Sequence, residues 1–127
     1  MPSHTITRKW TGNAGTVSKD IANTASSETV IDETVTTAQT DFLINIAIDV
    51  SVTKAFFITS SAAVTIETNS GTVPDNTIVL VADQPYDWFT GDYKTFLLTV
   101  DVTKFYVTNA SGSTATINIR VLQDATP

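Results

Sequence analysis

The sequence predicts an all-β domain, built as a two-sheet antiparallel sandwich of the jelly-roll kind with an extended N-terminal segment. Threonine and serine make up about a quarter of the 127 residues, and β-branched threonine suits the half-exposed face of a strand. Apolar and polar residues alternate with a period of two in short runs. Turn-forming residues separate these runs at regular intervals, which is typical of a sandwich or barrel.

The two clearest strands are Phe42–Val50 and Thr114–Leu122, where every second residue is apolar. Eight or more strands in one domain favour a jelly roll. An immunoglobulin-like sandwich stays open, because strand order cannot be read from the sequence. The other expected strands are Thr5–Trp10, Glu28–Thr36, Lys54–Thr59, Ala63–Thr68, Thr77–Ala82, Lys94–Val100 and Lys104–Asn109.

The alternation also predicts which side chains form the core. Residues of the same parity on one strand point to the same face of a sheet, and the apolar set is the one expected to be buried. These residues are Phe42, Ile44, Ile46, Ile48, Phe56, Ile58, Val64, Ile66, Phe105, Val107, Ile117 and Ile119.

Charge divides the chain into two parts. Up to Lys19 there are three bases and no acid, whereas the remainder has four bases against thirteen acids. We therefore separate residues 1–24, an N-terminal arm or first edge strand, from residues 25–127, the β-sandwich domain. As an arm, this segment would pack on a neighbouring subunit with Trp10 as an aromatic anchor. As an edge strand, it would place Trp10 in the core of its own sandwich.

Several classes of function are disfavoured by composition. The net charge of -6 argues against nucleic-acid binding, which needs clustered bases. No apolar run approaches the ~20 residues that span a bilayer, so no membrane partner is expected. With no cysteine and one histidine, His4, the chain has no expected metal site, cofactor or nucleophilic triad. His4 lies near a chain end, where few contacts are expected, so His4→Ala is expected to be silent.

Carboxylates are the remaining candidates for catalysis. Asp32 and Glu33 are sequence neighbours and point to opposite faces of a strand. Asp83, Asp87 and Asp92 lie close together among aromatic residues. A glycosidase needs two carboxyls about 5–10 Å apart beside a sugar-sized cleft, which a domain of this size rarely forms. We therefore do not expect an enzyme.

The aromatic segment Pro85–Tyr93 is the most unusual stretch. Alternation places Tyr86 and Trp88 on one face and Asp87 and Phe89 on the other, so one set is expected in the core and the other near the surface. Exposed aromatic residues anchor protein partners or stack on sugars, for which Trp88 and Tyr93 are the candidates. The predicted interface residues are Arg8, Lys9, Trp10, Tyr86, Trp88, Phe89 and Tyr93.

Several segments resemble one family along nearly the whole chain: Thr5–Trp10, Glu67–Gly71, Pro74–Ile78, Tyr106–Gly112 and Ile119–Pro127. They are similar to small virion proteins of tailed bacteriophages, of the capsid cement or decoration type. The resembling segments are turns and strands, so the resemblance carries over no functional residue. It implies a virion structural protein, in a family where several members are jelly rolls.

The leading hypothesis is thus a cement or decoration protein on the capsid surface, which bridges and stabilises subunits of the major capsid protein. It would itself form a homo-oligomer, a dimer or trimer. The alternatives are a carbohydrate-binding or receptor-binding sandwich on the virion, or a structural protein of the tail or neck.

Overall fold

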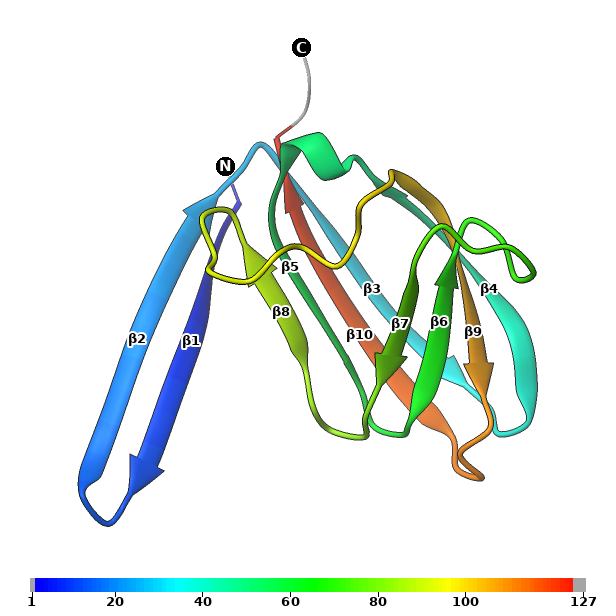
Figure 1. Cartoon of the computed structure of the whole chain (residues 1–127), viewed down its shortest axis with the longest axis horizontal. Coiled ribbons are helices and arrows are strands. Elements are labelled where there is room, and N and C mark those ends of the chain that lie inside the picture. Colours follow the sequence, from blue (N-terminus) through cyan, green and yellow to red (C-terminus); the bar gives the residue numbers. More distant parts are fainter. Residues whose placement is uncertain (1, 125–127) are drawn as a thin grey trace.

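The computed structural model describes residues 2–124, so Met1 and the end of the expected domain, residues 125–127, lie outside the described residues. In this range the chain forms two four-stranded sheets and a separate two-stranded hairpin (Figure 1). One 3-10 turn, η1 (Val50–Val52), accompanies the strands, and no helix in the described range is long and apolar enough to cross a membrane. The strands are β1 (Ser3–Gly12), β2 (Gly15–Thr24), β3 (Ser27–Val35), β4 (Gln39–Ile48), β5 (Thr53–Ser60), β6 (Val64–Thr68), β7 (Thr77–Leu80), β8 (Tyr86–Phe89), β9 (Val102–Asn109) and β10 (Ala115–Gln123).

The strand order is that of a jelly roll. One sheet has the order β3-β10-β5-β8 and the other β4-β9-β6-β7, and neighbouring strands in both are antiparallel. From β3 to β10, the chain changes sheet at every connection except the one between β6 and β7. This alternation between two sheets is the eight-stranded jelly-roll arrangement. The predicted fold is confirmed, and the immunoglobulin-like order is excluded.

The core lies between the two sheets and consists of the predicted alternating residues. Eleven of the twelve are buried, including Phe56 and Phe105, which have no exposed surface. Phe42 is half-buried and packs against the edge of this core. Because residues of one parity share a face, burying them together removes apolar surface from water at about 25 cal/mol for each Å². The apolar alternation therefore accounts for the sandwich.

Three strand assignments differ from the sequence prediction. Lys94–Val100 was expected to be a strand, but residues 94–100 form a loop. Its amides bond to side chains instead of a ladder: Leu97 N donates to Tyr86 Oη at 2.9 Å, and Thr99 N donates to Asn76 Oδ1 at 3.1 Å. Conversely, β2 and β8 were not expected as strands. The backbone of β2 pairs with β1 and that of β8 pairs with β5. The composition of β2 or of β8 by itself does not reveal these partners.

Candidate functional site

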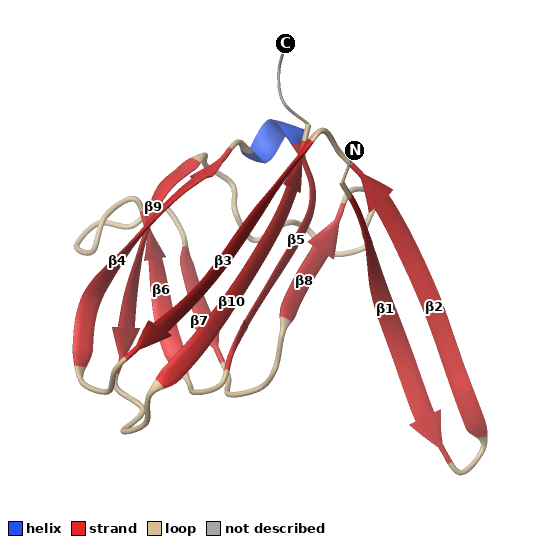
Figure 2. Ribbon diagram, turned by 180° about the vertical axis from the view of Figure 1, so that it is seen from behind, coloured by secondary structure: helices blue, strands red, loops and turns tan. Residues whose placement is uncertain are grey.

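Residues 3–24 form a β-hairpin that projects from the sandwich. The register of β1 with β2 runs without a break from Ser3–Thr24 to Gly12–Gly15, and Gly15 adopts a φ of 109°, which favours glycine at the turn. Figure 2 shows the hairpin attached near the N-terminus and diverging from the sheets towards its tip. Within residues 2–124, β1 pairs with β2 and with neither sandwich sheet. The expectation of a first edge strand is therefore wrong, and the segment is a folded hairpin instead of an extended arm.

The hairpin has one polar face and one face that carries all of its large apolar residues. Directly paired residues of antiparallel strands project to the same side. On one side the pairs are Ser3–Thr24, Thr5–Ala22, Thr7–Asp20, Lys9–Ser18 and Thr11–Thr16, which are almost all small and polar. On the other side the pairs are His4–Asn23, Ile6–Ile21, Arg8–Lys19 and Trp10–Val17. The sequence thus makes the hairpin amphipathic, and we call the second side its apolar face.

The half of the apolar face nearest the chain terminus packs on the sandwich. Ile6 is buried in a small cluster with Ala25, Ala55 and Leu122, against which Phe89 packs. Ala55, Leu122 and Phe89 belong to the sheet β3-β10-β5-β8, so the hairpin rests on the outer side of that sheet. This satellite core fixes the base of the hairpin.

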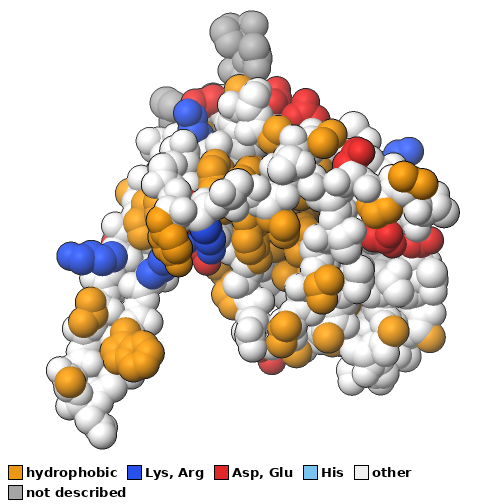
Figure 3. Space-filling view, viewed as in Figure 1, with side chains coloured by type: hydrophobic (Ala, Val, Ile, Leu, Met, Phe, Trp, Pro, Cys, Tyr) orange, Lys and Arg blue, Asp and Glu red, His pale blue; other side chains and the backbone are white. Residues whose placement is uncertain are grey.

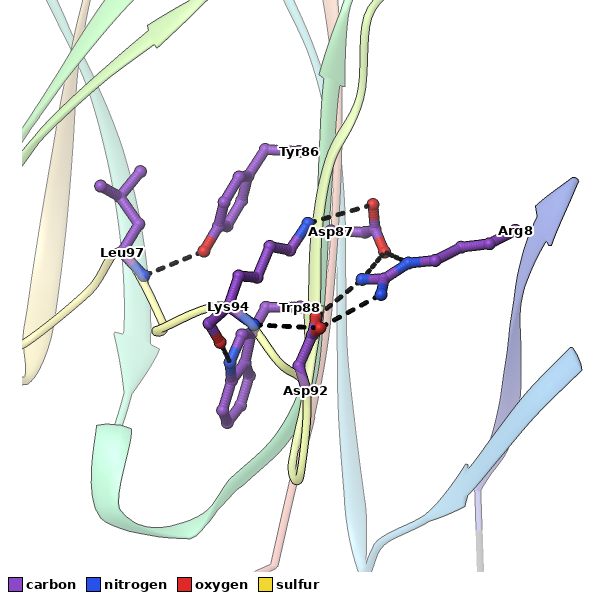
Figure 4. A network of polar contacts seen from close by, with 7 residues as sticks. All are labelled: Arg8, Tyr86, Asp87, Trp88, Asp92, Lys94 and Leu97. Carbon is purple, nitrogen blue, oxygen red and sulfur yellow. Dashed lines mark hydrogen bonds and ion pairs between the residues drawn. The ribbon is translucent and has the colours of Figure 1, made fainter. Parts of the chain in front are cut away.

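Arg8 clamps the middle of the hairpin to β8 and to the loop that follows it (Figure 4). Its Nη2 and Nη1 atoms donate to Asp92 Oδ2 at 2.7 Å and to Asp92 Oδ1 at 3.1 Å. Its Nη2 and Nε atoms also donate to Asp87 Oδ2 at 2.9 Å and 3.2 Å. The guanidinium carbon lies 4.8 Å from the centre of the Phe89 ring and 5.6 Å from that of Tyr93. A planar guanidinium suits this combination of bidentate carboxylate and ring contacts.

Burial makes this clamp electrostatically strong. The Asp92 side chain has no exposed surface. The hydrogen bonds from Arg8 are the main cause that holds the pKa of Asp92 below its usual range, and they outweigh the opposing effect of burial. The same bond to Asp92 is the largest cause that raises the pKa of Arg8. Lys94 Nζ adds a contact of 3.6 Å to Asp87. The Asp92 carboxylate is thus held ionised, which suits a structural clamp and not a general acid.

The aromatic residues of β8 divide between two environments. Tyr86 faces the sandwich core, with its ring centre 6.0 Å from that of Phe56. Trp88 stacks on Phe96 at 4.3 Å, and its Nε1 donates to Lys94 O at 3.1 Å. Burial is the main cause that raises the pKa of Tyr86. Phe89 faces the hairpin base instead.

The far half of the apolar face has no partner among the described residues. Trp10 is 74% exposed and its cross-strand neighbour Val17 is 66% exposed. Apolar side chains stand clear of the body on this part of the hairpin in Figure 3. The expectation that Trp10 could belong to the core of its own sandwich is therefore wrong. An exposed tryptophan on a rigid support is a common anchor for a protein partner.

The predicted interface residues fall into three groups. Arg8, Phe89 and Tyr93 meet at the clamp, and Tyr93 is 91% exposed there. Lys9 and Trp10 lie on opposite faces of the outer hairpin. The third group, Tyr86 and Trp88, is turned towards the body, so Trp88 and Tyr93 do not form a shared open platform.

Four residues that form the clamp or the apolar face of the hairpin were not predicted as interface residues. Asp87 and Asp92 were considered only for catalysis. Their contact with Arg8 was not foreseen, because 79 and 84 residues separate them from it. Ile6 and Val17 could have been found: the turn signal Gly12–Gly15 followed by alternation in residues 17–21 indicates a hairpin with one apolar face.

His4 is better packed than its place near the chain end suggests. It lies within β1 on the apolar face, opposite Asn23. Its Nε2 atom contacts the carboxylate of Glu28 on β3. The expectation of few contacts is therefore wrong, because the hairpin carries this residue onto the edge of the sheet.

A cavity of about 220 Å³ lies in the angle between β1 and the sheet beneath it. It is bordered by apolar groups such as Ile6, Phe57 and Leu122, with Arg120 among its polar residues. Arg120 Nη1 lies 2.8 Å from Asp32 Oδ1, so this guanidinium already forms an ion pair. Among residues 2–124, no group of three or more imidazole, thiol or carboxylate side chains is placed to hold a metal ion.

Comparison with known proteins adds little to this geometry. No protein-family model matches the chain, and no curated protein matches its sequence. Among solved structures, the chain is similar to one of Bacillus endospore appendages, which are described as a novel family of disulfide-linked pili. The identity is 16%, the alignment covers 81% of this chain and 96% of that one, and the TM-score is 0.31. A similarity at this level assigns neither a family nor a function.

Proposed function

We propose that this chain is a structural protein of a virion, a cement or decoration protein that binds the capsid surface and bridges subunits of the major capsid protein. The observation that carries the proposal is the rigidly held hairpin with Trp10 and Val17 exposed on it. A bridging protein needs at least two attachment surfaces in a defined relation. The sandwich body supplies one, and the hairpin clamped by Arg8 supplies a second.

The resemblance to phage cement proteins, read from the turns and strands of the sequence, supports the same proposal. A cement protein acts through buried area repeated many times over a shell, so it requires a stable body and no reaction chemistry. Asp87 and Asp92 both accept hydrogen bonds from Arg8, which is consistent with such a role.

The test is binding to empty shells assembled from the major capsid protein of the same genome. We expect the protein to sediment with the shells and to raise the temperature at which they disrupt. Free protein sedimented alone is the control. Failure to bind shells would overturn the proposal.

The alternative roles use different surfaces or sites. A sugar-binding role would rest on Tyr93, whose ring is exposed, whereas Trp88 is stacked on Phe96. A glycan array tests this role. A tail or neck protein would use the same hairpin at another place in the particle, and cryo-electron microscopy of purified virions distinguishes that position from the capsid surface.

A further inference from the structure

The outer part of the hairpin, Trp10 and Val17 with the neighbouring Lys19, is an apolar and basic surface that no other described residue covers. The hairpin, residues 3–24, carries three bases and one acid, while residues 25–124 carry four bases and twelve acids. Arg8 is neutralised by Asp87 and Asp92. Lys9 and Lys19 have no ion-pair partner among the described residues, so their charge is available to a partner.

The end of the molecule opposite the hairpin tip carries a complementary groove. Its volume is about 360 Å³; Ala47 and Val52 present apolar surface in its lining, and Ile48 and Val102 lie beneath it almost fully buried. The carboxylates at this groove are Asp49, Asp101 and Asp124. Acidic side chains gather over this end, near η1, in Figure 3. We call this feature the acidic groove.

Most of this negative charge is not balanced within the molecule. Lys54 Nζ lies 3.6 Å from Asp124. Asp49 and Asp101 accept hydrogen bonds from Ser51 N at 3.0 Å and Val50 N at 2.9 Å, and no cation of residues 2–124 lies within ion-pair distance of either. These two charges are therefore available to a cation from another chain.

The hairpin cannot fill the acidic groove of its own chain. The base of the hairpin is fixed near the groove end of the molecule, and its tip points to the opposite end (Figure 1). The Arg8 clamp holds that direction. Two hairpins packed through their apolar faces would leave Lys19 without a carboxylate, because this face carries no acidic residue.

We propose that the outer hairpin of one copy docks in the acidic groove of a second copy, so that the chains associate head to tail. Trp10 and Val17 bury apolar surface against the groove, and Lys19 approaches Asp49 and Asp101. Such a contact joins two different surfaces and therefore continues from copy to copy into a ring or a chain. The inference rests on the proposed function in one respect, the use of the hairpin for attachment. It adds that the hairpin attaches to another copy of this chain.

The experiment uses two variants of the full chain in sedimentation velocity at low salt. In the hairpin variant, Trp10→Thr and Lys19→Gln remove the anchor and one charge, and threonine and glutamine remain compatible with a strand. In the groove variant, Asp49→Asn and Asp101→Asn remove the two charges that Lys19 approaches but keep the side-chain acceptors for Ser51 N and Val50 N. Circular dichroism and thermal melting confirm that each variant is folded.

We expect the unmodified protein to form oligomers that dissociate as salt is added, since ion pairs are screened. Each variant alone is expected to be monomeric, while an equimolar mixture forms a discrete dimer from the intact groove of one and the intact hairpin of the other. A matched control, Val79→Thr with Lys104→Gln, changes an exposed valine and an exposed lysine on the other sheet and should associate normally.

Three results would overturn the inference: a monomeric unmodified protein at high micromolar concentration, oligomers that persist in the groove variant, or a mixture that stays monomeric. Shell binding is measured separately on the same samples. A monomer that binds shells would refute head-to-tail association and leave the cement proposal standing. Oligomers that do not bind shells would refute the cement proposal and leave head-to-tail association standing.

Discussion

Arg8 and Asp92 are 84 residues apart in the sequence, yet Arg8 Nη2 lies 2.7 Å from Asp92 Oδ2. This contact joins a hairpin outside the jelly roll to a loop of its sheet edge. Because the Asp92 carboxylate is fully buried under the guanidinium, the contact is the main polar constraint on the direction of the hairpin.

Replacing Arg8 by Met should destabilise the protein by about 1–3 kcal/mol, because Asp92 and Asp87 lose charge-assisted hydrogen bonds. The stability of Arg8→Lys should lie between that of the unmodified protein and that of Arg8→Met, since an ammonium keeps the charge but not the bidentate geometry. Urea unfolding gives the stability, and hydrogen exchange should show faster exchange in residues 3–24. Lys9→Met, on the exposed face of the same strand, is the control. An unchanged midpoint for Arg8→Met would refute the clamp.

The clamp should also make stability depend on pH at the acid end. The pKa of Asp92 is lower in the folded protein than in the unfolded chain, so the unfolded state binds more protons on acidification. Its contribution is fully present above the unfolded pKa of about 3.9 and is lost as pH falls through the folded value. Unfolding by urea from pH 7 to pH 2 measures this loss.

An Asp92→Asn variant should be less stable at pH 7 and should lose less stability on acidification. Asp83→Asn is the control, because Asp83 is an exposed turn residue with a φ of 60° that asparagine tolerates. If Asp92→Asn retained the full acid dependence, the carboxylate would not be its source.

The two tryptophans should differ in fluorescence. Trp10 is exposed, whereas Trp88 is stacked on Phe96 and donates its indole N–H to Lys94 O. We expect Trp10→Phe to leave blue-shifted emission that iodide quenches weakly, and Trp88→Phe to leave red-shifted emission that iodide quenches strongly. The reverse order would contradict the placement of both rings. Measurement at a concentration where the chain is monomeric keeps Trp10 free of any partner.

Asn109 should be among the most sensitive polar positions. Its side chain is buried, and its Nδ2 donates to Val35 O at 3.0 Å and Ser113 O at 2.8 Å. Val35 lies on β3, so this amide of β9 links the two sheets. Asn109→Ala should cost about 2–3 kcal/mol in unfolding free energy, because buried carbonyls lose their donor. The control is Asn13→Ala at the exposed hairpin tip, and equal midpoints for the two variants would contradict the role.

The sequence alone was sufficient for the sandwich and its core. A period of two is a local property of the backbone, so Ile44, Phe56 and Ile117 could be assigned to the buried face without knowing their neighbours. The same reasoning failed at Lys94–Val100, which has strand-like residues but whose amides bond to Tyr86 and Asn76. Whether a segment joins a ladder depends on which partner is in reach, and that is not local.

The candidate site depended on tertiary structure for the same reason. The sequence by itself determined that residues 3–24 contain a turn, alternating residues and excess positive charge. Only the folded chain decided that Arg8 meets Asp87 and Asp92, and that the hairpin projects with Trp10 uncovered. Contacts between residues about 80 positions apart arise from the packing of sheets, and no local pattern of hydrophobicity or charge encodes them.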